Sequence, residues 1–239
     1  MLITIYVDDL LMASNDEQLL KQVKRSLAEN FEMKDIGPIK TCLGIEFHQD
    51  LKTNSVFLGQ RKYAEEILIR FGMEQCKPIQ TPMELNCRLE KPASANESEM
   101  KVYPYQNLLG ALMYLSVTTR PDIAFTVSFL SQFNSNYSLQ HWKAAKRVLR
   151  YVKGTINYGL LYKKSDSELY GVADADWGAN LADRRSYSGF AFILAGGSIS
   201  WEARKQRIVS LSTTESEYMA LCETTKEALY LREILNEIG

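Results

Sequence analysis

Two groups of carboxylates are the residues of this chain whose types and spacing could do chemistry. The first is the adjacent pair Asp8 and Asp9, which lies inside the apolar stretch Leu2–Met12. Two like charges this close repel each other, and a bound divalent cation removes that cost. Phosphoryl-transfer enzymes use such pairs to hold two metal ions about 4 Å apart. A solvated acidic turn is the alternative, because aspartate is common in turns.

The second group combines the end of a predicted strand with the start of a predicted helix. Asp174 and Asp176 follow the strand, and Glu215 and Glu217 open the helix. A strand carboxylate that faces a helix carboxylate is a geometry found at metal sites. Spacing alone also permits a solvated surface, because acidic residues favour helix starts.

The elements that position these carboxylates follow from apolar periodicity and turn signals. Leu2–Met12 predicts two short strands joined by a tight acidic turn, and Ser14 or Asn15 can cap the next helix. The apolar positions of that helix are Leu19, Leu20, Val23, Leu27 and Phe31. The remaining expected elements are strands at 41–47 and 55–58, a helix at 63–71 ended by Gly72, helices at 105–118, 123–133 and 139–152, strands at 169–173, 188–194 and 198–202 with a turn at Gly196-Gly197, and a helix at 215–238.

Composition places the chain among globular proteins and suggests no partner. It has 239 residues, 46% of them hydrophobic, with a formal net charge of −1. The longest strongly apolar run, Phe190–Ala195, is far shorter than the roughly 20 residues that cross a bilayer. Four dispersed cysteines and two isolated histidines show no zinc-site spacing. We therefore expect no membrane span, and any nucleic-acid binding must come from local basic patches.

One such patch is predicted on the helix at 139–152. Lys143, Lys146, Arg147 and Arg150 fall on one side of it, opposite an apolar side. A solvated helix face normally mixes both signs, so this all-basic stripe favours contact with phosphates. Such contacts would position a nucleic acid without reading its sequence.

The string from Tyr6 to Leu11, Tyr-Val-Asp-Asp-Leu-Leu, resembles the aspartate-pair motif of reverse transcriptases. The match extends, in the order seen in copia-type elements, through Leu43-Gly44-Ile45-Glu46, residues 60–63, Thr81-Pro82-Met83 and residues 105–122. The resemblance implies that Asp8 and Asp9 are metal ligands, with Asp8 the principal one, and that Tyr6 lines the primer terminus. The family places its fingers and a further palm aspartate upstream of this hairpin, so we expect no polymerisation by these residues alone.

Residues 184–189, 196–201, 205–206 and 210–221 together resemble the ribonuclease H domain of copia-type polyproteins. This resemblance puts the catalytic, metal-binding role on Asp174 and Glu217, with Asp176 and Glu215 as close alternates. Such enzymes cleave the RNA strand of an RNA–DNA hybrid through a metal-bound water. The family supplies further aspartates and strands after the last helix, so we expect an incomplete metal cage.

These patterns predict an α+β chain in three parts: a reverse transcriptase palm and thumb remnant at 1–90, a mainly helical connection at 91–165 and a truncated ribonuclease H-like mixed sheet with a helix at 166–239. The implied parent is an RNA-directed DNA polymerase and ribonuclease H that uses two Mg²⁺ or Mn²⁺ ions per site. Its partners would be an RNA template, a DNA primer and an RNA–DNA hybrid. The alternatives left open are a non-catalytic nucleic-acid-binding or polymerase-interacting protein retained by the host, and an untranslated relic.

Overall fold

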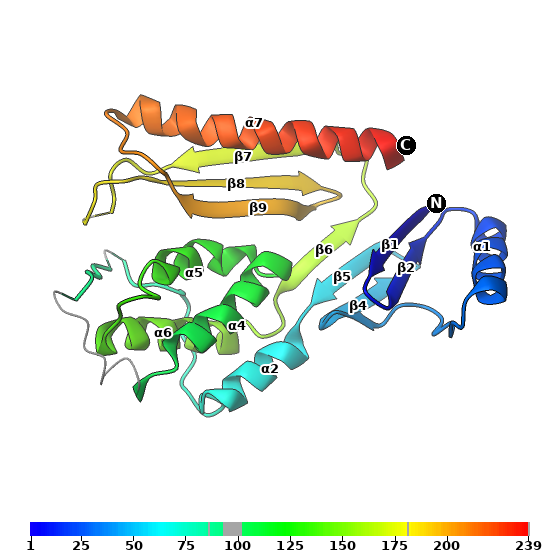
Figure 1. Ribbon diagram of the computed structural model, residues 1–239, viewed down its shortest axis with the longest axis horizontal. Coiled ribbons are helices and arrows are strands. Elements are labelled where there is room, and N and C mark those ends of the chain that lie inside the picture. The colour runs from blue at the N-terminus through cyan, green and yellow to red at the C-terminus, as the bar shows by residue number, and fades with distance from the viewer. Residues whose placement is uncertain (86, 93–101, 181, 239) are drawn as a thin grey trace.

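The computed structural model describes residues 1–85, 87–92, 102–180 and 182–238, which form a mixed α+β architecture (Figure 1). The strands are β1 (Leu2–Tyr6), β2 (Asp9–Ala13), β3 (Thr41–Cys42), β4 (Ile45–Asp50), β5 (Ser55–Gly59), β6 (Gly159–Lys163), β7 (Tyr170–Ala175), β8 (Tyr187–Leu194) and β9 (Gly197–Lys205). The helices are α1 (Glu17–Asn30), α2 (Arg61–Arg70), α4 (Tyr105–Thr118), the 3₁₀ turn η1 (Pro121–Ile123), α5 (Ala124–Ser131), α6 (Leu139–Gly154) and α7 (Thr213–Ile238). None of these helices is long and apolar enough to cross a membrane.

Within the described residues the strands form three antiparallel sheets. β1 pairs with β2, the second sheet has the order β3-β4-β5-β6, and the third has the order β7-β8-β9. The strand β6 follows the helices in sequence but pairs with β5, from Ser55 opposite Lys163 to Gly59 opposite Gly159. The second sheet therefore combines strands that precede the helical segment in the sequence with a strand that follows it.

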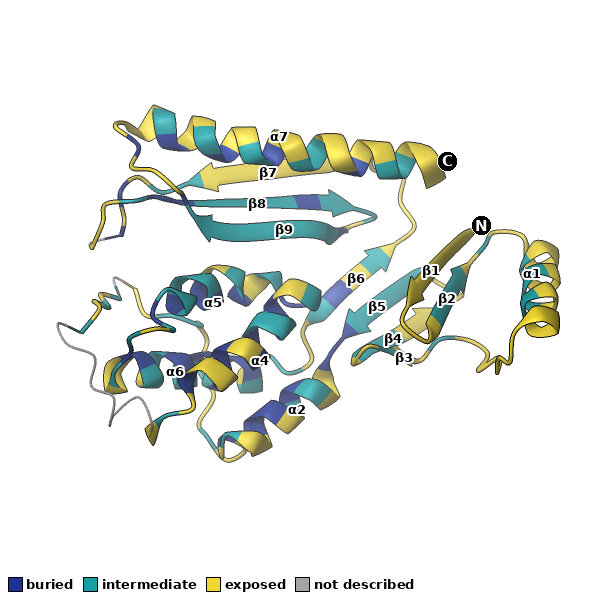
Figure 2. Ribbon diagram, viewed as in Figure 1, coloured by how far each residue is buried: buried dark blue, intermediate teal, exposed yellow. Residues whose placement is uncertain are grey.

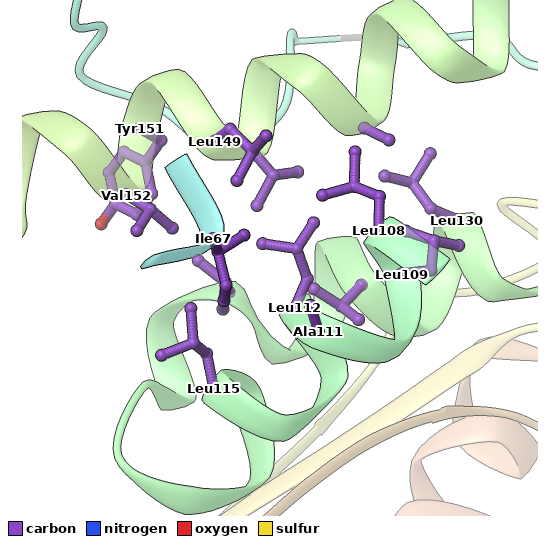
Figure 3. Packing of buried hydrophobic residues seen from close by; sticks show 14 of the residues in the cluster. Ile67, Leu108, Leu109, Ala111, Leu112, Leu115, Leu130, Leu149, Tyr151 and Val152 are labelled. Carbon is purple, nitrogen blue, oxygen red and sulfur yellow. The ribbon is translucent and has the colours of Figure 1, made fainter. Parts of the chain in front are cut away.

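The helices α2, α4, α5 and α6 enclose the main hydrophobic core (Figure 3). Ile67, Leu108, Leu112 and Leu149 are fully buried there. Tyr105 is buried as well, and its hydroxyl donates a hydrogen bond to the Leu130 carbonyl at 2.8 Å. Burial raises the pKa of Tyr105, so it acts as a neutral donor. The core thus joins α2, which precedes the predicted linker, to the three helices that follow it.

An ion pair between the buried Arg120 and the exposed Asp122 fixes the entry to η1. The Arg120 guanidinium donates to both carboxylate oxygens of Asp122, at 2.9 and 2.8 Å, and to the Thr155 carbonyl. Tyr151 donates to the same carboxylate, and its pKa is raised to about 12, chiefly by burial. Because every charge in this cluster has partners, the network ties the start of η1 to the end of α6.

The β7-β8-β9 sheet lies between α7 on one face and the core helices on the other (Figure 1). The Trp201 indole on β9 donates to the Ser116 carbonyl on α4 at 2.7 Å. Gln132, just after α5, accepts from the Asn180 amide at 2.9 Å and from the Lys205 ammonium at 3.2 Å. These contacts attach the last third of the chain to the helical core.

Residues 1–50 lie at the periphery (Figure 2). Every residue of β1 is exposed, and no residue of α1 is buried. The β3-β4 turn contacts the core through the Tyr114 hydroxyl, which donates to the Leu43 carbonyl. Glu46 on β4 accepts from the Arg61 backbone N–H at 2.9 Å and so caps α2 from a distance. The second sheet is therefore anchored, whereas the first hairpin is solvated.

Three local expectations need correction, and one strand was missed. The strand predicted at 41–47 is broken, because Leu43 and Gly44 turn the chain with φ of 49° and 72°. The hairpin turn predicted at Gly196-Gly197 lies one residue earlier, at Ala195-Gly196, and Gly197 pairs with Leu194. Asp16, and not Ser14 or Asn15, caps α1 by accepting from the N–H groups of Gln18 and Leu19. Finally, the sequence pattern did not predict β6.

The other predicted helices are confirmed with small shifts at their ends. Gly72 ends α2 as expected, with φ of 62° just beyond the helix. The linker predicted at 76–100 contains no helix or strand in its described part, and residues 86 and 93–101 lie outside the described residues.

Candidate functional sites

The first acidic pair occupies the tip of the β1-β2 hairpin. Tyr6 pairs with Asp9, which leaves Val7 and Asp8 as the two turn residues. Asp9 is therefore the first residue of β2, while Asp8 is in the turn, and both side chains are exposed. Two solvated carboxylates next to each other can ligate a hard divalent cation together with water.

The turn of this hairpin carries backbone strain. Val7 has φ of 51°, a conformation that favours glycine and is an outlier for a β-branched residue. Such strain costs about 1–3 kcal/mol and concentrates at functional sites. Tyr6, beside it, is also exposed. Sequence reasoning missed the special backbone of Val7, because glycine or asparagine is the usual signal for such a turn.

The second acidic pair lies where β7 ends beside the start of α7 (Figure 1). Asp174 is in β7 opposite Gly189, and Glu217 is in the second turn of α7. Both side chains are exposed, and neither has a hydrogen bond or ion pair within the described residues. The fold thus brings a strand carboxylate and a helix carboxylate to the same end of the sheet and of the helix that covers it.

The two alternate carboxylates have structural partners. Asp176 accepts a hydrogen bond from the Tyr187 backbone N–H at 2.8 Å. Burial raises the pKa of Asp176, while this bond and one from the Ala179 backbone act in the opposite direction. Glu215 accepts from the Leu211 N–H at 2.7 Å and stabilises the start of α7. Asp174 and Glu217 are therefore the free members of this group.

The two acidic pairs form separate sites. Asp8 and Asp9 belong to the β1-β2 hairpin, whereas Asp174 belongs to the separate β7-β8-β9 sheet. No group of three or more His, Cys, Asp or Glu side chains with a metal-binding arrangement occurs among the described residues. Each site accordingly offers one pair of carboxylates.

The four basic residues predicted on one side of α6 fall into two groups, those with partners in the segment 77–84 and those without. Arg147 donates to the Glu84 carboxylate at 2.9 Å and to the Thr81 hydroxyl at 3.0 Å, and Arg150 donates to the Lys77 carbonyl at 2.8 Å. Lys143 and Lys146 have no carboxylate partner in the described part of the chain, and the Lys146 ammonium lies 6.0 Å from the centre of the Trp142 ring. The two arginines thus hold the segment 77–84, whereas the two lysines remain available to bind an anion.

Comparison with known proteins shows to which family this chain belongs. Residues 1–85 match the family described as reverse transcriptase (RNA-dependent DNA polymerase), whose members normally use divalent metal ions. The chain is 40% identical, over its full length, to the Pol polyprotein of transposon TNT 1-94 from Nicotiana tabacum. It is 35% identical, over 98% of its length, to that of transposon RE2 from Arabidopsis thaliana. It belongs to the copia-type retrotransposon Pol polyprotein family.

The chain spans only part of those polyproteins, 18% of the tobacco protein and 16% of the RE2 protein. By contrast, it covers 92% of an uncharacterized mitochondrial protein of Arabidopsis thaliana, with 40% identity. No solved structure matches the chain.

Proposed function

We propose that this chain is the part of a copia-type RNA-directed DNA polymerase and ribonuclease H that carries acidic residues of both active sites. Asp8 and Asp9 belong to the polymerase site, and Asp174 and Glu217 belong to the ribonuclease H site. The observation that carries this proposal is the position of both pairs: each lies exposed at the end of its element, in a chain related to Pol polyproteins over its full length. The parts are residues 1–90 as a palm and thumb segment, 91–165 as the connection and 166–239 as a ribonuclease H-like segment.

The carboxylate pairs fit one divalent ion each. Mg²⁺ is commonly held by one or two carboxylates, with waters and substrate phosphates completing the shell. In the described residues, Asp174 and Glu217 are free of competing partners, and the hairpin pair is solvated. When bound, Mg²⁺ or Mn²⁺ would stabilise negative charge on phosphate oxygens. A pair of ions needs more ligands than two carboxylates provide.

The other residues of the proposed sites act by position. Tyr6 lies next to the strained turn and is exposed, so its ring can contact a primer terminus beside Asp8. Lys143 and Lys146 are free to contact phosphates of a template, primer or hybrid. Arg147 and Arg150 can reach phosphates only by giving up or sharing their bonds to the segment 77–84.

We further propose that residues 1–239 by themselves neither polymerise nor cleave. Catalysis of phosphoryl transfer requires metals, nucleophile and substrate in one fixed geometry, and two carboxylates per site do not provide it. The test is primer extension on a primed RNA template, and cleavage of an RNA–DNA hybrid, with Mg²⁺ or Mn²⁺. We expect no product above background. Template-dependent extension or hybrid cleavage by this polypeptide would contradict the proposal.

A second candidate is a non-catalytic protein that binds nucleic acid or a polymerase. It is favoured by the mitochondrial relative, since a chain of nearly the same span occurs there as a protein of its own. The two candidates differ in their dependence on the carboxylates. A quadruple variant, D8N/D9N/D174N/E217Q, would abolish activity of a longer polyprotein, whereas it would leave a purely binding function intact.

A further inference from the structure

A hollow of about 640 Å³ opens between α6 and residues 82–84 and 87–89. We call it the α6 hollow. Apolar side chains line it, among them Met73, Met83, Leu130 and Ala144. Its volume is within the range of roughly 300–1,000 Å³ that is common for ligand pockets. The hollow exists because Arg147 and Arg150 hold residues 77–84 against α6.

Cations surround this apolar floor. Lys143, Lys146 and Arg88 line the hollow, and none of the three has an ion pair within the described residues. The Glu84 carboxylate also lines it but is paired with Arg147. The hollow therefore presents unbalanced positive charge next to apolar surface, and its complement is an anionic ligand with apolar faces.

A hydroxyl-bearing side chain adds a third feature. Thr126 on α5 lines the hollow and is only 4% exposed. A ligand in the hollow can hydrogen-bond to its hydroxyl group.

We propose that the α6 hollow binds a short unpaired stretch of nucleic acid, with phosphates on the lysines and base faces on the apolar floor. This inference rests on the proposed phosphate contacts of Lys143 and Lys146 and specifies which form of nucleic acid they take. In a duplex the bases are stacked inside, and a protein meets only phosphates and groove edges. An unpaired strand also offers its base faces, which can cover the apolar lining of the hollow and exclude water from it.

The apolar residues that line the hollow also predict that it binds all four bases with similar affinity. Base selection on single strands comes mainly from stacking strength on aromatic side chains. Met73, Met83, Leu130 and Ala144 are aliphatic or thioether side chains and present no flat ring. The hollow should therefore accept any unpaired sequence.

The experiment is fluorescence anisotropy on residues 1–239 with a labelled, unstructured oligonucleotide of about ten nucleotides, a length within the ~4–16 nucleotides typical of single-strand sites. The same sequence in a blunt duplex, inorganic polyphosphate and a polyglutamate peptide serve as competing ligands. We expect the single strand to bind about tenfold more tightly than the duplex, and polyglutamate to compete poorly. Equal affinity for strand and duplex would overturn the inference, and efficient displacement by polyglutamate would identify the hollow as a peptide site.

Two variants separate the cations from the floor. Lys143→Ala with Lys146→Ala should weaken strand binding about tenfold and reduce the salt slope by about 1.4, because each single-strand phosphate contact contributes roughly 0.7. Met83→Ser should weaken strand binding severalfold, leave the salt slope unchanged and leave polyphosphate binding intact. Lys34→Ala with Lys52→Ala removes two exposed charges elsewhere and is the matched control. An unaffected Met83→Ser variant would contradict a role for the floor.

The outcomes also separate this inference from the function on which it rests. If strand and duplex bind equally and both depend on Lys143 and Lys146, the proposed phosphate contacts stand and the choice of an unpaired strand fails. If no nucleic acid binds, both fail. The carboxylate pairs are tested independently by metal binding.

Discussion

The two regions that carry acidic pairs differ in how the fold supports them. The hairpin with Asp8 and Asp9 and the following helix α1 bury no residue, and their apolar side chains remain in contact with solvent. The strand with Asp174 belongs to a three-stranded sheet that α7 covers on one face and the core helices cover on the other. One pair is therefore presented on a solvated ribbon, whereas the other is presented on an exposed strand whose sheet packs on the core.

This difference shows that an amphipathic pattern does not by itself produce burial. α1 and α6 both show strong apolar periodicity, yet α6 buries six residues and α1 buries none. A helix is stabilised in proteins mainly by packing its apolar face, so α1 depends on intrinsic propensity and its cap. The geometry of the first pair should consequently be the easier of the two to perturb.

Leucine truncation should give the largest contrast between the regions. Leu112→Ala, in the centre of the core, should lower the free energy of unfolding by about 2–5 kcal/mol, because it removes buried methyl groups and leaves a cavity. Leu27→Ala, at a half-buried position of α1, should change it by less, about 0.5 kcal/mol, because this helix buries no residue. Urea unfolding followed by circular dichroism measures both. Similar losses at the two positions would mean that α1 packs as the core helices do.

The docking of the β7-β8-β9 sheet on the core is tested at Gln132. Gln132→Ala leaves the amide of buried Asn180 without its partner and should cost about 1–3 kcal/mol. The loss should appear as faster hydrogen exchange in β8 and β9 while β1 and β2 are unaffected. Trp201→Phe, which keeps an aromatic ring but loses the indole N–H that donates to the Ser116 carbonyl, should act on the same strands. Exchange that rises equally in all strands would indicate that the sheets are not separately supported.

Helix caps give the smallest and sharpest contrast. Ser138 caps α6 in a reciprocal arrangement with His141, and Asp16 caps α1. Replacing either with alanine should cost about 1 kcal/mol of helix stability. Ser138→Ala should lower global stability, because α6 is part of the core. Asp16→Ala should only increase hydrogen exchange within α1, and a global loss from this variant would contradict the account.

Much of this architecture could be predicted from local patterns. The helices predicted at 105–118 and 139–152 have long apolar periods and clear breaks at Arg120-Pro121 and at the Asn-Ser-Asn turn of residues 134–136, so their predicted bounds were nearly right. The acidic hairpin was also predictable, because strand-forming residues flank Asp8 and Asp9.

The errors arise where a distant partner decides the structure. β6 is a short strand that exists by pairing with β5, about a hundred residues earlier. The role of Glu46 as a cap for α2 likewise depends on a contact between separate elements. The division of the α6 stripe could not be predicted either, because the segment 77–84 has no periodicity that would place it beside Arg147 and Arg150.

Divalent metal binding tests the central claim most directly. Electron paramagnetic resonance of free Mn²⁺ can count the weak sites on residues 1–239 and on two variants, D8N/D9N and D174N/E217Q. Each variant should lose one site, because each pair of carboxylates holds one ion with water. Asp166→Asn with Glu168→Gln, which removes two acidic residues outside both sites, should change nothing. Unchanged Mn²⁺ binding in both pair variants would contradict the assignment of these four carboxylates as metal ligands.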